Sequence, residues 1–173
     1  MRTVALRVAA LALLLLLALV SVITTRMVNR LPNSVIYFVR AEETTFTLEG
    51  VRQRLDADTP EERLEQTLQR LIQGPSEENV GLSSAFPPGT KVRKLERIDD
   101  AVMVDLSADF AQGGGTATML GRLNQLFYTL TQPADISRVS LHVEGEPVTA
   151  LGGEGILVPQ PWTEPEERTL PVW

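Results

Sequence analysis

An uninterrupted apolar stretch near the N-terminus most constrains what this 173-residue chain can fold into. Residues 8–25 read VAALALLLLLALVSVITT and contain no charged side chain. At 1.5 Å per residue, a helix of this length covers about 27 Å, which is close to the hydrocarbon thickness of a bilayer. Five consecutive leucines at 13–17 leave the helix no polar face for water, so a place in a soluble core is disfavoured. We therefore predict one transmembrane helix ahead of the folded domain.

The charges that flank this stretch favour one orientation in a membrane. Arg2, Arg7 and the α-amino group precede it and Arg26 and Arg30 follow it, so the excess of positive charge on the N-terminal side is small. This bias favours a cytoplasmic N-terminus. The C-terminal domain would then be extracytoplasmic, on the periplasmic or cell-wall side of a single-pass membrane protein.

A cleavable secretory signal is the alternative for the same stretch. Such a signal has a shorter apolar core and small residues at its cleavage site. Residues 19–24, LVSVIT, contain no site of this kind, so an uncleaved anchor is favoured while cleavage stays open as the alternative. The residues that represent the predicted anchor are Val8, Leu13, Leu17 and Ile23.

Charge and cysteine content exclude several function classes. The chain has no cysteine, which excludes disulfide scaffolds, thiol catalysis and cysteine-based metal sites. All four basic residues of the first 30 positions lie beside the apolar stretch, so the remainder has 12 basic and 22 acidic residues and a net charge of −10. A domain with this charge does not attract nucleic acid or anionic lipid electrostatically.

Two helices are indicated in the part that follows. Thr59 is placed to cap a helix in which Pro60 takes the first position and Glu62 completes a capping box, and Gly74 is placed to end it. The second helix is predicted by apolar residues at helical spacing over residues 119–130. It lies between a run of three glycines and a Gln-Pro stop.

Strands account for most of the remaining pattern. The predicted strands cover residues 35–39, 46–51, 92–98, 101–106, 139–144 and 148–151. The order β-β-α-β-β-α-β-β predicts an α+β fold, with a mainly antiparallel sheet and two helices on one face. Residues 1–30 form the predicted anchor or signal, 31–158 the folded domain, and 159–173 an extended tail rich in Pro and Glu.

Six stretches, found together and in order, resemble the GerMN domain of sporulation and spore-germination proteins, which also occurs in envelope proteins of bacteria that do not sporulate. They are VIYFVR from Val35, LIQGP from Leu71, LSSAFPPGT from Leu82, VDLSADF from Val104, LFYTLT from Leu126 and VSLHVEGEPV from Val139. The resemblance covers residues 35–157. It implies an exported, membrane-attached binding or scaffolding domain, similar in fold to ring-building modules of envelope complexes and without established catalytic residues. The chain has one such unit and an apolar anchor, where the best-known members have two units and a lipidated cysteine.

Two groups of polar residues have residue types found in catalytic sites. Ser140, His142 and Glu144 have the residue types of a hydrolase triad, but residues two apart in a strand are separated by about 6.6 Å, so a solvated strand face is favoured. Asp105 and Asp109 could serve in glycoside cleavage, yet Asp residues also end strands and shape turns by accepting bonds from backbone amides. We expect no enzymatic activity.

Cofactor sites are not indicated either. The glycines at 113–115 precede a helix as in a phosphate cradle, but no Lys-Ser or Lys-Thr follows, so a hinge or tight turn is favoured. His142 alone cannot hold zinc, which takes three or four protein ligands. No metal and no cofactor are predicted.

Four residues are candidates for binding a partner. The candidates are Phe86 and Pro87 in an ordered loop, His142 on a strand, and Trp162 in the tail. Phe86 could equally close over the core, and the tail could be an inert spacer. The expected function is non-catalytic binding or scaffolding in a cell-envelope assembly, through an envelope protein partner or self-association, with membrane contact only through the N-terminal helix. Binding of an envelope glycan such as peptidoglycan is the alternative, followed by a carboxylate-dependent envelope hydrolase.

Overall fold

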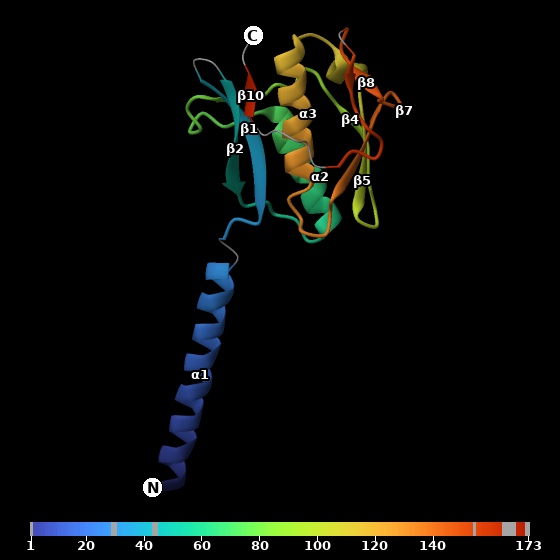
Figure 1. Ribbon diagram of the computed structural model, residues 1–173. Coiled ribbons are helices and arrows are strands. Elements are labelled where there is room, and N and C mark those ends of the chain that lie inside the picture. Colours follow the sequence, from blue (N-terminus) through green and yellow to red (C-terminus); the bar gives the residue numbers. More distant parts are fainter. Residues whose placement is uncertain (1, 29–30, 43–44, 154, 164–168, 172–173) are drawn as a thin grey trace. The chain divides into compact units, whose positions relative to one another are not determined.

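The computed structural model describes residues 2–28, 31–42, 45–153, 155–163 and 169–171 (Figure 1). The chain divides into two compact units, Met1–Pro32 and Asn33–Trp173.

The first unit is built on one long helix, α1, which spans Arg2–Val28. Its described leucines are exposed, with fractions of 58% at Leu13 and 57% at Leu17, and Ile23 is 46% exposed. The side chain of Val8 lies outside the described residues. Within the described part of the chain, no helix combines enough length with enough apolar character to cross a membrane. The transmembrane segment therefore stays a prediction.

The second unit contains two four-stranded sheets. The first has the order β10-β2-β1-β3, with every neighbouring pair antiparallel. Its strands are β1 Ser34–Ala41, β2 Thr45–Gln53, β3 Leu82–Ser83 and β10 Thr169–Pro171. Ile36 and Phe38 of β1 are fully buried, so this strand supplies one wall of the core.

The second sheet has the order β4-β5-β6-β7. Its strands are β4 Val92–Ile98, β5 Ala101–Leu106, β6 Arg138–Val143 and β7 Glu146–Pro147. β4 and β5, both predicted as strands, form an antiparallel hairpin around Asp99 and Asp100, whereas β5 and β6 are parallel. Two parallel neighbours need a crossover, and the helix between them supplies it. A short hairpin of β8 Ala150–Leu151 and β9 Ile156–Leu157 follows.

Helix α2, Pro60–Gln73, begins and ends where its local chemistry predicts. The Thr59 hydroxyl accepts a bond from the Glu62 backbone N–H at 3.1 Å. Glu62 in turn accepts from the backbone N–H of Asp58 at 2.9 Å. Gly74 ends the helix at φ 87°, a left-handed conformation that glycine adopts without a Cβ clash. The buried face of α2 carries Leu64, Thr67, Leu68 and Leu71.

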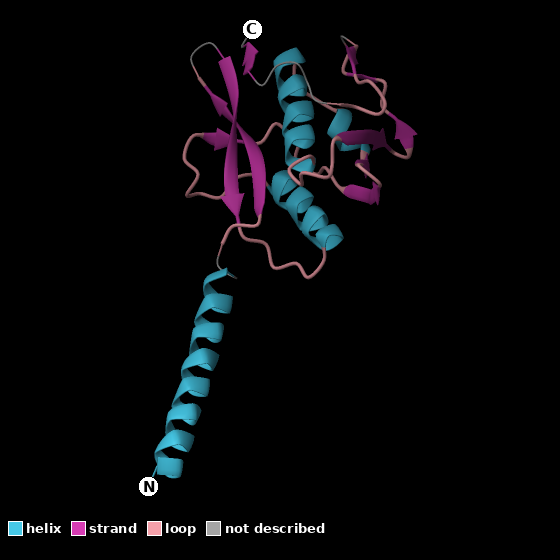
Figure 2. Cartoon of the chain, turned by 60° about the horizontal axis from the view of Figure 1, so that its bottom comes forward, coloured by secondary structure: helices cyan, strands magenta, loops and turns pink. Residues whose placement is uncertain are grey.

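Helix α3, Thr116–Leu130, lies between the two sheets (Figures 1 and 2). Every residue from Gly121 to Leu130 is buried, including Arg122, Asn124 and Gln125. A helix that covered one face of a single sheet would leave such polar residues in water. The prediction of one sheet with two helices on one face is therefore wrong in its layering, although the α+β fold and the order of most elements are confirmed. A 3₁₀ turn, η1, at Ala108–Ala111 brings Phe110 into the same core.

Residues 159–163, at the start of the segment predicted as an extended tail, pack on the domain. Trp162 and Val139 exchange two backbone hydrogen bonds of 2.7 and 2.8 Å, which adds a bridge to β6. The Gln160 amide donates to the carbonyl oxygen of Val148 at 2.7 Å. Strand β10 then pairs with β2. The Gln160 amide thus satisfies a carbonyl oxygen of the folded domain, and the Trp162 side chain buries apolar surface on it. Trp173 lies outside the described residues.

Candidate interaction groove

The Phe86 side chain is part of the core. It is 7% exposed, and its ring meets the ring of Phe110 edge-on at a centroid distance of 5.3 Å. Pro87, its neighbour, is half-buried. The burial supports the reading in which this loop closes over the core.

Two buried polar side chains of α3 hold this loop in place. Gln125 is fully buried and accepts from the Ala85 backbone N–H at 2.7 Å, while its amide donates to the Tyr37 carbonyl oxygen at 3.0 Å. Arg122 is 2% exposed and donates to the Ala85 carbonyl oxygen at 3.0 Å. Together with Phe86 and Phe110, these side chains connect β1, the loop and η1.

Arg122 also holds the segment that precedes α3. It donates to the carbonyl oxygens of Phe110, Gln112 and Gly113, the latter two at 3.2 and 3.1 Å. Its guanidinium carbon lies 5.6 Å from the centre of the Phe110 ring. Burial lowers the pKa of Arg122 from its ordinary value. Sequence reasoning missed Arg122 and Gln125, and their only signal was their polar character inside an apolar helical pattern.

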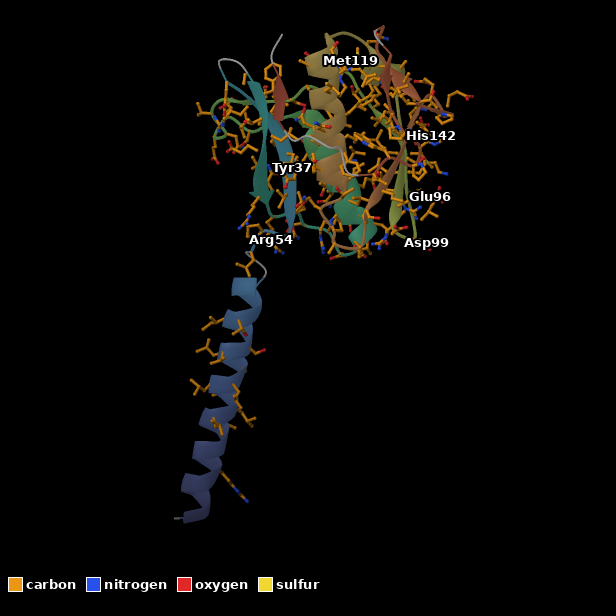
Figure 3. All side chains as sticks on the ribbon, viewed as in Figure 1. Tyr37, Arg54, Glu96, Asp99, Met119 and His142 are labelled. Carbon is orange, nitrogen blue, oxygen red and sulfur yellow. The ribbon has the colours of Figure 1, made fainter. Side chains whose placement is uncertain are left out.

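The triad-like residues on β6 do not form a triad. Ser140 Oγ lies 3.4 Å from Nε2 of His142, but His142 Nδ1 faces the Gly145 carbonyl oxygen at 3.3 Å. Glu144 turns away at φ 53° to accept from the Ala108 backbone N–H and from Arg93. His142 lies half-buried on the second sheet, labelled in Figure 3. The third group that would orient the histidine is thus a carbonyl oxygen and not a carboxylate.

The carboxylates near the end of β5 are engaged in turns and ion pairs. Asp105, 8% exposed, accepts from the Gly145 backbone N–H at 2.9 Å and from Arg93 Nε at 3.2 Å. Asp109 accepts from the Ser107 hydroxyl at 3.1 Å. Among the residues described, no group of three or more His, Cys, Asp or Glu side chains could hold a metal ion.

Trp162 is 6% exposed and stacks at a tilt on Phe127, with ring centroids 4.9 Å apart. It therefore anchors its own segment to α3. Of the predicted binding residues, only His142 and Pro87 retain partly exposed side chains, and the structure does not bring these two into one pocket that it describes.

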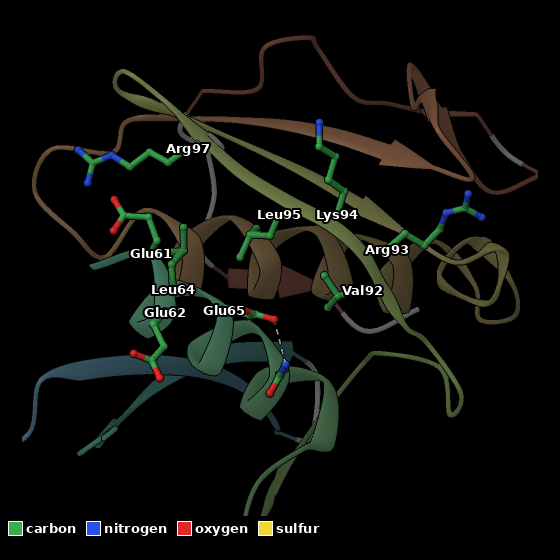
Figure 4. Close-up of a pocket in the computed structure, with 10 residues that line it drawn as sticks. Glu61, Glu62, Leu64, Glu65, Val92, Arg93, Lys94, Leu95 and Arg97 are labelled. Carbon is green, nitrogen blue, oxygen red and sulfur yellow. Dashed lines mark hydrogen bonds between the residues drawn. The ribbon is translucent and has the colours of Figure 1, made fainter. Parts of the chain in front are cut away.

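A groove lies between α2 and β4 on the surface of the domain (Figure 4). Its volume is about 370 Å³. Three glutamates from the first turns of α2, Glu61, Glu62 and Glu65, line one side. Leu64 and Leu95 lie between the two walls and pack against the core beneath them. The groove thus has an acidic helical wall and an apolar floor.

The other wall of the groove is an edge strand. Among the described strands, β4 is the outermost one of the second sheet and pairs only with β5. In an antiparallel pair, every second residue directs its N–H and C=O away from its partner. The register shifts between Val92 and Lys94, so Arg93 is an extra residue in a bulge. From Lys94 to Ile98 the register is regular and the free edge continuous.

The basic residues of β4 are paired with carboxylates from outside the groove. Arg93 pairs with Asp105 and Glu144, and Lys94 pairs with Glu96 at 2.7 Å. Figure 4 shows Arg93 and Lys94 pointing away from α2. 

The third basic residue of this wall, Arg97, also has its ion-pair partner outside the groove, although Figure 4 draws its side chain near Glu61. Arg97 pairs with Asp135, and this hydrogen bond lowers the pKa of Asp135. In the part of the chain that the structure describes, none of the ion pairs joins β4 to a glutamate of α2. The glutamates of the helical wall and the basic residues of the strand thus line the same groove without a described ion pair between them.

Comparison with known proteins identifies the family. The family model described as "Germane: Sporulation and spore germination" matches residues 35–149. The chain belongs to the Germane family. A comparison with curated proteins finds no match.

Solved structures share the Germane fold. The tandem GerMN domains of the sporulation protein GerM from Bacillus subtilis align with a TM-score of 0.60 and 22% identity, over 78% of this chain and 45% of that one. The first GerMN domain of the same protein aligns with a TM-score of 0.60 and 20% identity, over 75% of this chain and 96% of that one. A Clostridium perfringens protein provisionally named a lipoprotein aligns with a TM-score of 0.50 and 27% identity, over 69% and 78%. This chain therefore spans less than half of the tandem-domain structure.

The Germane match covers both sheets and both packed helices, apart from β10. The groove lies wholly inside the matched region, since α2 and β4 both fall within residues 35–149. The sequence analysis did not predict it, because the two walls are separated along the chain. The available signals were the acidic start of α2 and the alternation of charged and apolar residues in β4.

Proposed function

We propose that this Germane domain is a non-catalytic protein-binding module, tethered to a membrane and acting in a cell-envelope assembly. The observation that carries the proposal is the free edge of β4 beside the groove. Exposed strand edges are ready templates for pairing with another chain. A domain that keeps one open next to a hollow with an apolar floor has the features of a docking site.

The arrangement of the polar residues favours binding over catalysis. The Asp105 carboxylate and Glu144 are occupied by Arg93 and by backbone amides. The Ser140 and His142 side chains approach each other without an orienting carboxylate. A general base needs a hydrogen bond to the group that it deprotonates and a pocket that holds the substrate. Neither Ser140 nor His142 lines a described pocket.

Membrane tethering is the second part of the proposal. It is supported by the 18-residue uncharged stretch at residues 8–25 and by the helical conformation of α1. The exposed leucines of α1 find no cover in their own unit. Confinement beside a membrane raises the effective concentration of a partner and allows weak contacts to assemble.

Glycan binding is a second candidate because of a further hollow on α2. This hollow encloses about 380 Å³ and is lined by Gln66, Gln69, Arg70 and Gln73. Side-chain amides can donate to and accept from sugar hydroxyls. No aromatic residue lines it, so the stacking platform typical of sugar sites is missing from the described lining.

Site-specific photo-crosslinking in the native cell tests the protein-binding function. A photoreactive residue at Gln69 borders both hollows, and one at the exposed position Val80 serves as the matched control. We expect discrete protein adducts from position 69 and not from position 80. Adducts found only in the peptidoglycan fraction would favour glycan binding, and no adduct at position 69 would overturn both candidates.

A further inference from the structure

We propose that the groove takes a basic, extended segment of a protein partner as an added strand on the free edge of β4. The inference rests on the proposed protein-binding function and specifies the chemistry of the partner. Lysine or arginine side chains of the added strand would face the glutamates of α2. Three observations carry the argument: the edge, the charge and the floor of the groove.

Among the described strands, the outer edge of β4 is open, and its register is regular from Lys94 to Ile98. In the first sheet, β3 covers only two residues of β1, and α3 satisfies the next part of that edge. The Thr129 hydroxyl accepts from the Tyr37 backbone N–H at 3.0 Å, and the Gln125 amide donates to the Tyr37 carbonyl oxygen. In the second sheet, β7 and the Trp162 bridge occupy the far side of β6. β4 offers seven residues, and the structure describes no strand on its outer side.

The charge on α2 selects a basic occupant. Glu61 and Glu65 are exposed, and neither meets a cation among the described ion pairs. The basic residues on the facing strand have Asp105, Glu144, Glu96 and Asp135 as their described ion-pair partners, which leaves the two glutamates open to a further cation. The chain after residue 30 carries a net charge of −10, which also attracts a basic segment at longer range.

The floor of the groove suits the stems of long basic side chains. Leu64 and Leu95 provide apolar surface between the helix and the strand. Lysine and arginine pack their methylene stems on such surface while their charged ends reach polar groups. Alternate side chains of an added strand point to the same face. A segment with a basic residue at every second position would therefore place its cations along α2.

A second copy of this chain fits the edge less well. Two copies of the part after residue 30 each carry a net charge of −10 and repel one another, whereas a basic segment is attracted.

Peptide binding to the full chain in neutral detergent tests the inference. The probe is a synthetic peptide in which lysine alternates with valine, and binding is followed by fluorescence anisotropy at low salt. We expect this peptide to bind, and its glutamate-for-lysine counterpart to remain unbound. The double variant Glu61→Gln with Glu65→Gln should weaken binding roughly three- to tenfold, as expected for the loss of two exposed ion pairs. The matched control replaces the exposed Glu77 and Glu78 by Gln and should bind as the parent chain does.

Backbone methylation separates strand addition from general electrostatic attraction. Methyl groups on the amides of all lysines block one edge of the peptide strand, and methyl groups on those of all valines block the other. For one direction of the added strand, with its lysines toward α2, only one of these edges faces β4, so one methylated peptide should lose affinity by about tenfold or more while the other binds. Equal binding of the two methylated peptides, or equal weakening by the control variant, would overturn the inference.

The outcomes also separate this inference from the proposed function. If the peptides fail but position 69 still crosslinks to a discrete protein, the domain binds proteins and the basic-strand inference is wrong. If crosslinking fails as well, the protein-binding function is wrong. A dimer that sedimentation detects and that the Glu61→Gln, Glu65→Gln variant dissociates would assign the groove to a second copy and overturn the proposed occupant.

Discussion

Arg122 shows at the scale of a single residue how the family motifs become structure. Its guanidinium is buried and donates to carbonyl oxygens on both sides of η1 and in the loop that carries Phe86. No carboxylate is among the partners described for it. A buried charge without hydrogen bonds is costly, so these carbonyl groups compensate the desolvation of Arg122. The two stretches LSSAFPPGT and VDLSADF meet at Arg122, so both contribute to the packing of the domain.

Replacing Arg122 by methionine should therefore unfold the domain more readily. The substitution keeps apolar bulk but leaves up to four carbonyl oxygens without this donor. We expect a loss of about 2 to 4 kcal/mol in the free energy of unfolding. Arg122→Lys should recover only part of it, because an ammonium lacks the planar fork of donors. Urea unfolding followed by near-ultraviolet circular dichroism measures the change, with the exposed Arg70→Met as the control. Equal stability of Arg122→Met and Arg70→Met would contradict this role.

Asp100 provides a pH-dependent contribution to stability. Hydrogen bonds from Arg138 and then from Ser137 lower the pKa of Asp100 from 3.8 to about 2. Because the pKa is lower in the folded state, the contribution is present above pH 4 and is lost as the pH falls toward 2. The Asp100→Asn variant should be less stable than the parent at pH 7, and the difference should shrink through this range. Melting temperatures of both proteins from pH 7 to pH 2 give the measurement. A difference that does not change with pH would exclude Asp100 as its source.

At the scale of elements, local chemistry predicts boundaries well and layers poorly. The limits of α2 were predictable because Thr59, Pro60 and Gly74 act on their own neighbours. The surroundings of α3 were not, because its burial on both sides depends on β6 returning parallel to β5. The sequence pattern of β6 is the same for either direction. The groove was missed for the same reason, since it forms only when α2 and β4 meet.

A substitution of Trp162 tests whether the segment around it contributes to the folded domain. Its ring packs on Phe127 and its backbone pairs with Val139. Truncation to alanine removes a nearly fully buried side chain, and such changes cost about 3 to 5 kcal/mol. We expect Trp162→Ala to lower stability by this amount in urea unfolding and to expose residues 158–163 to proteolysis. Thr163→Ala, at the exposed neighbouring position, should change neither. If Trp162→Ala kept full stability and lost a binding partner instead, Trp162 would be a docking residue as the sequence analysis first suggested.

At the scale of the whole molecule, the proposed function depends on linking the two compact units in one chain. The groove has an acidic wall and one free edge, and single contacts of this kind are weak. A tether that confines the domain next to its partners would offset this weakness without any new contact. Membrane attachment is therefore the property on which the assembly role depends most.

Two charges placed in the apolar stretch should abolish that attachment. In the variant Leu14→Arg with Leu17→Asp, each charge costs about 2.5 to 3.5 kcal/mol at the centre of a membrane helix. We expect the parent chain to stay with membranes during alkaline carbonate extraction and the double variant to appear in the soluble fraction. Leu31→Arg, outside the stretch, is the matched control and should fractionate as the parent does. Release of the parent chain by carbonate would contradict the proposed membrane tethering. The folded domain would then have to find its partners by affinity alone, and the groove would need to bind them far more tightly than one free strand edge and two exposed glutamates allow.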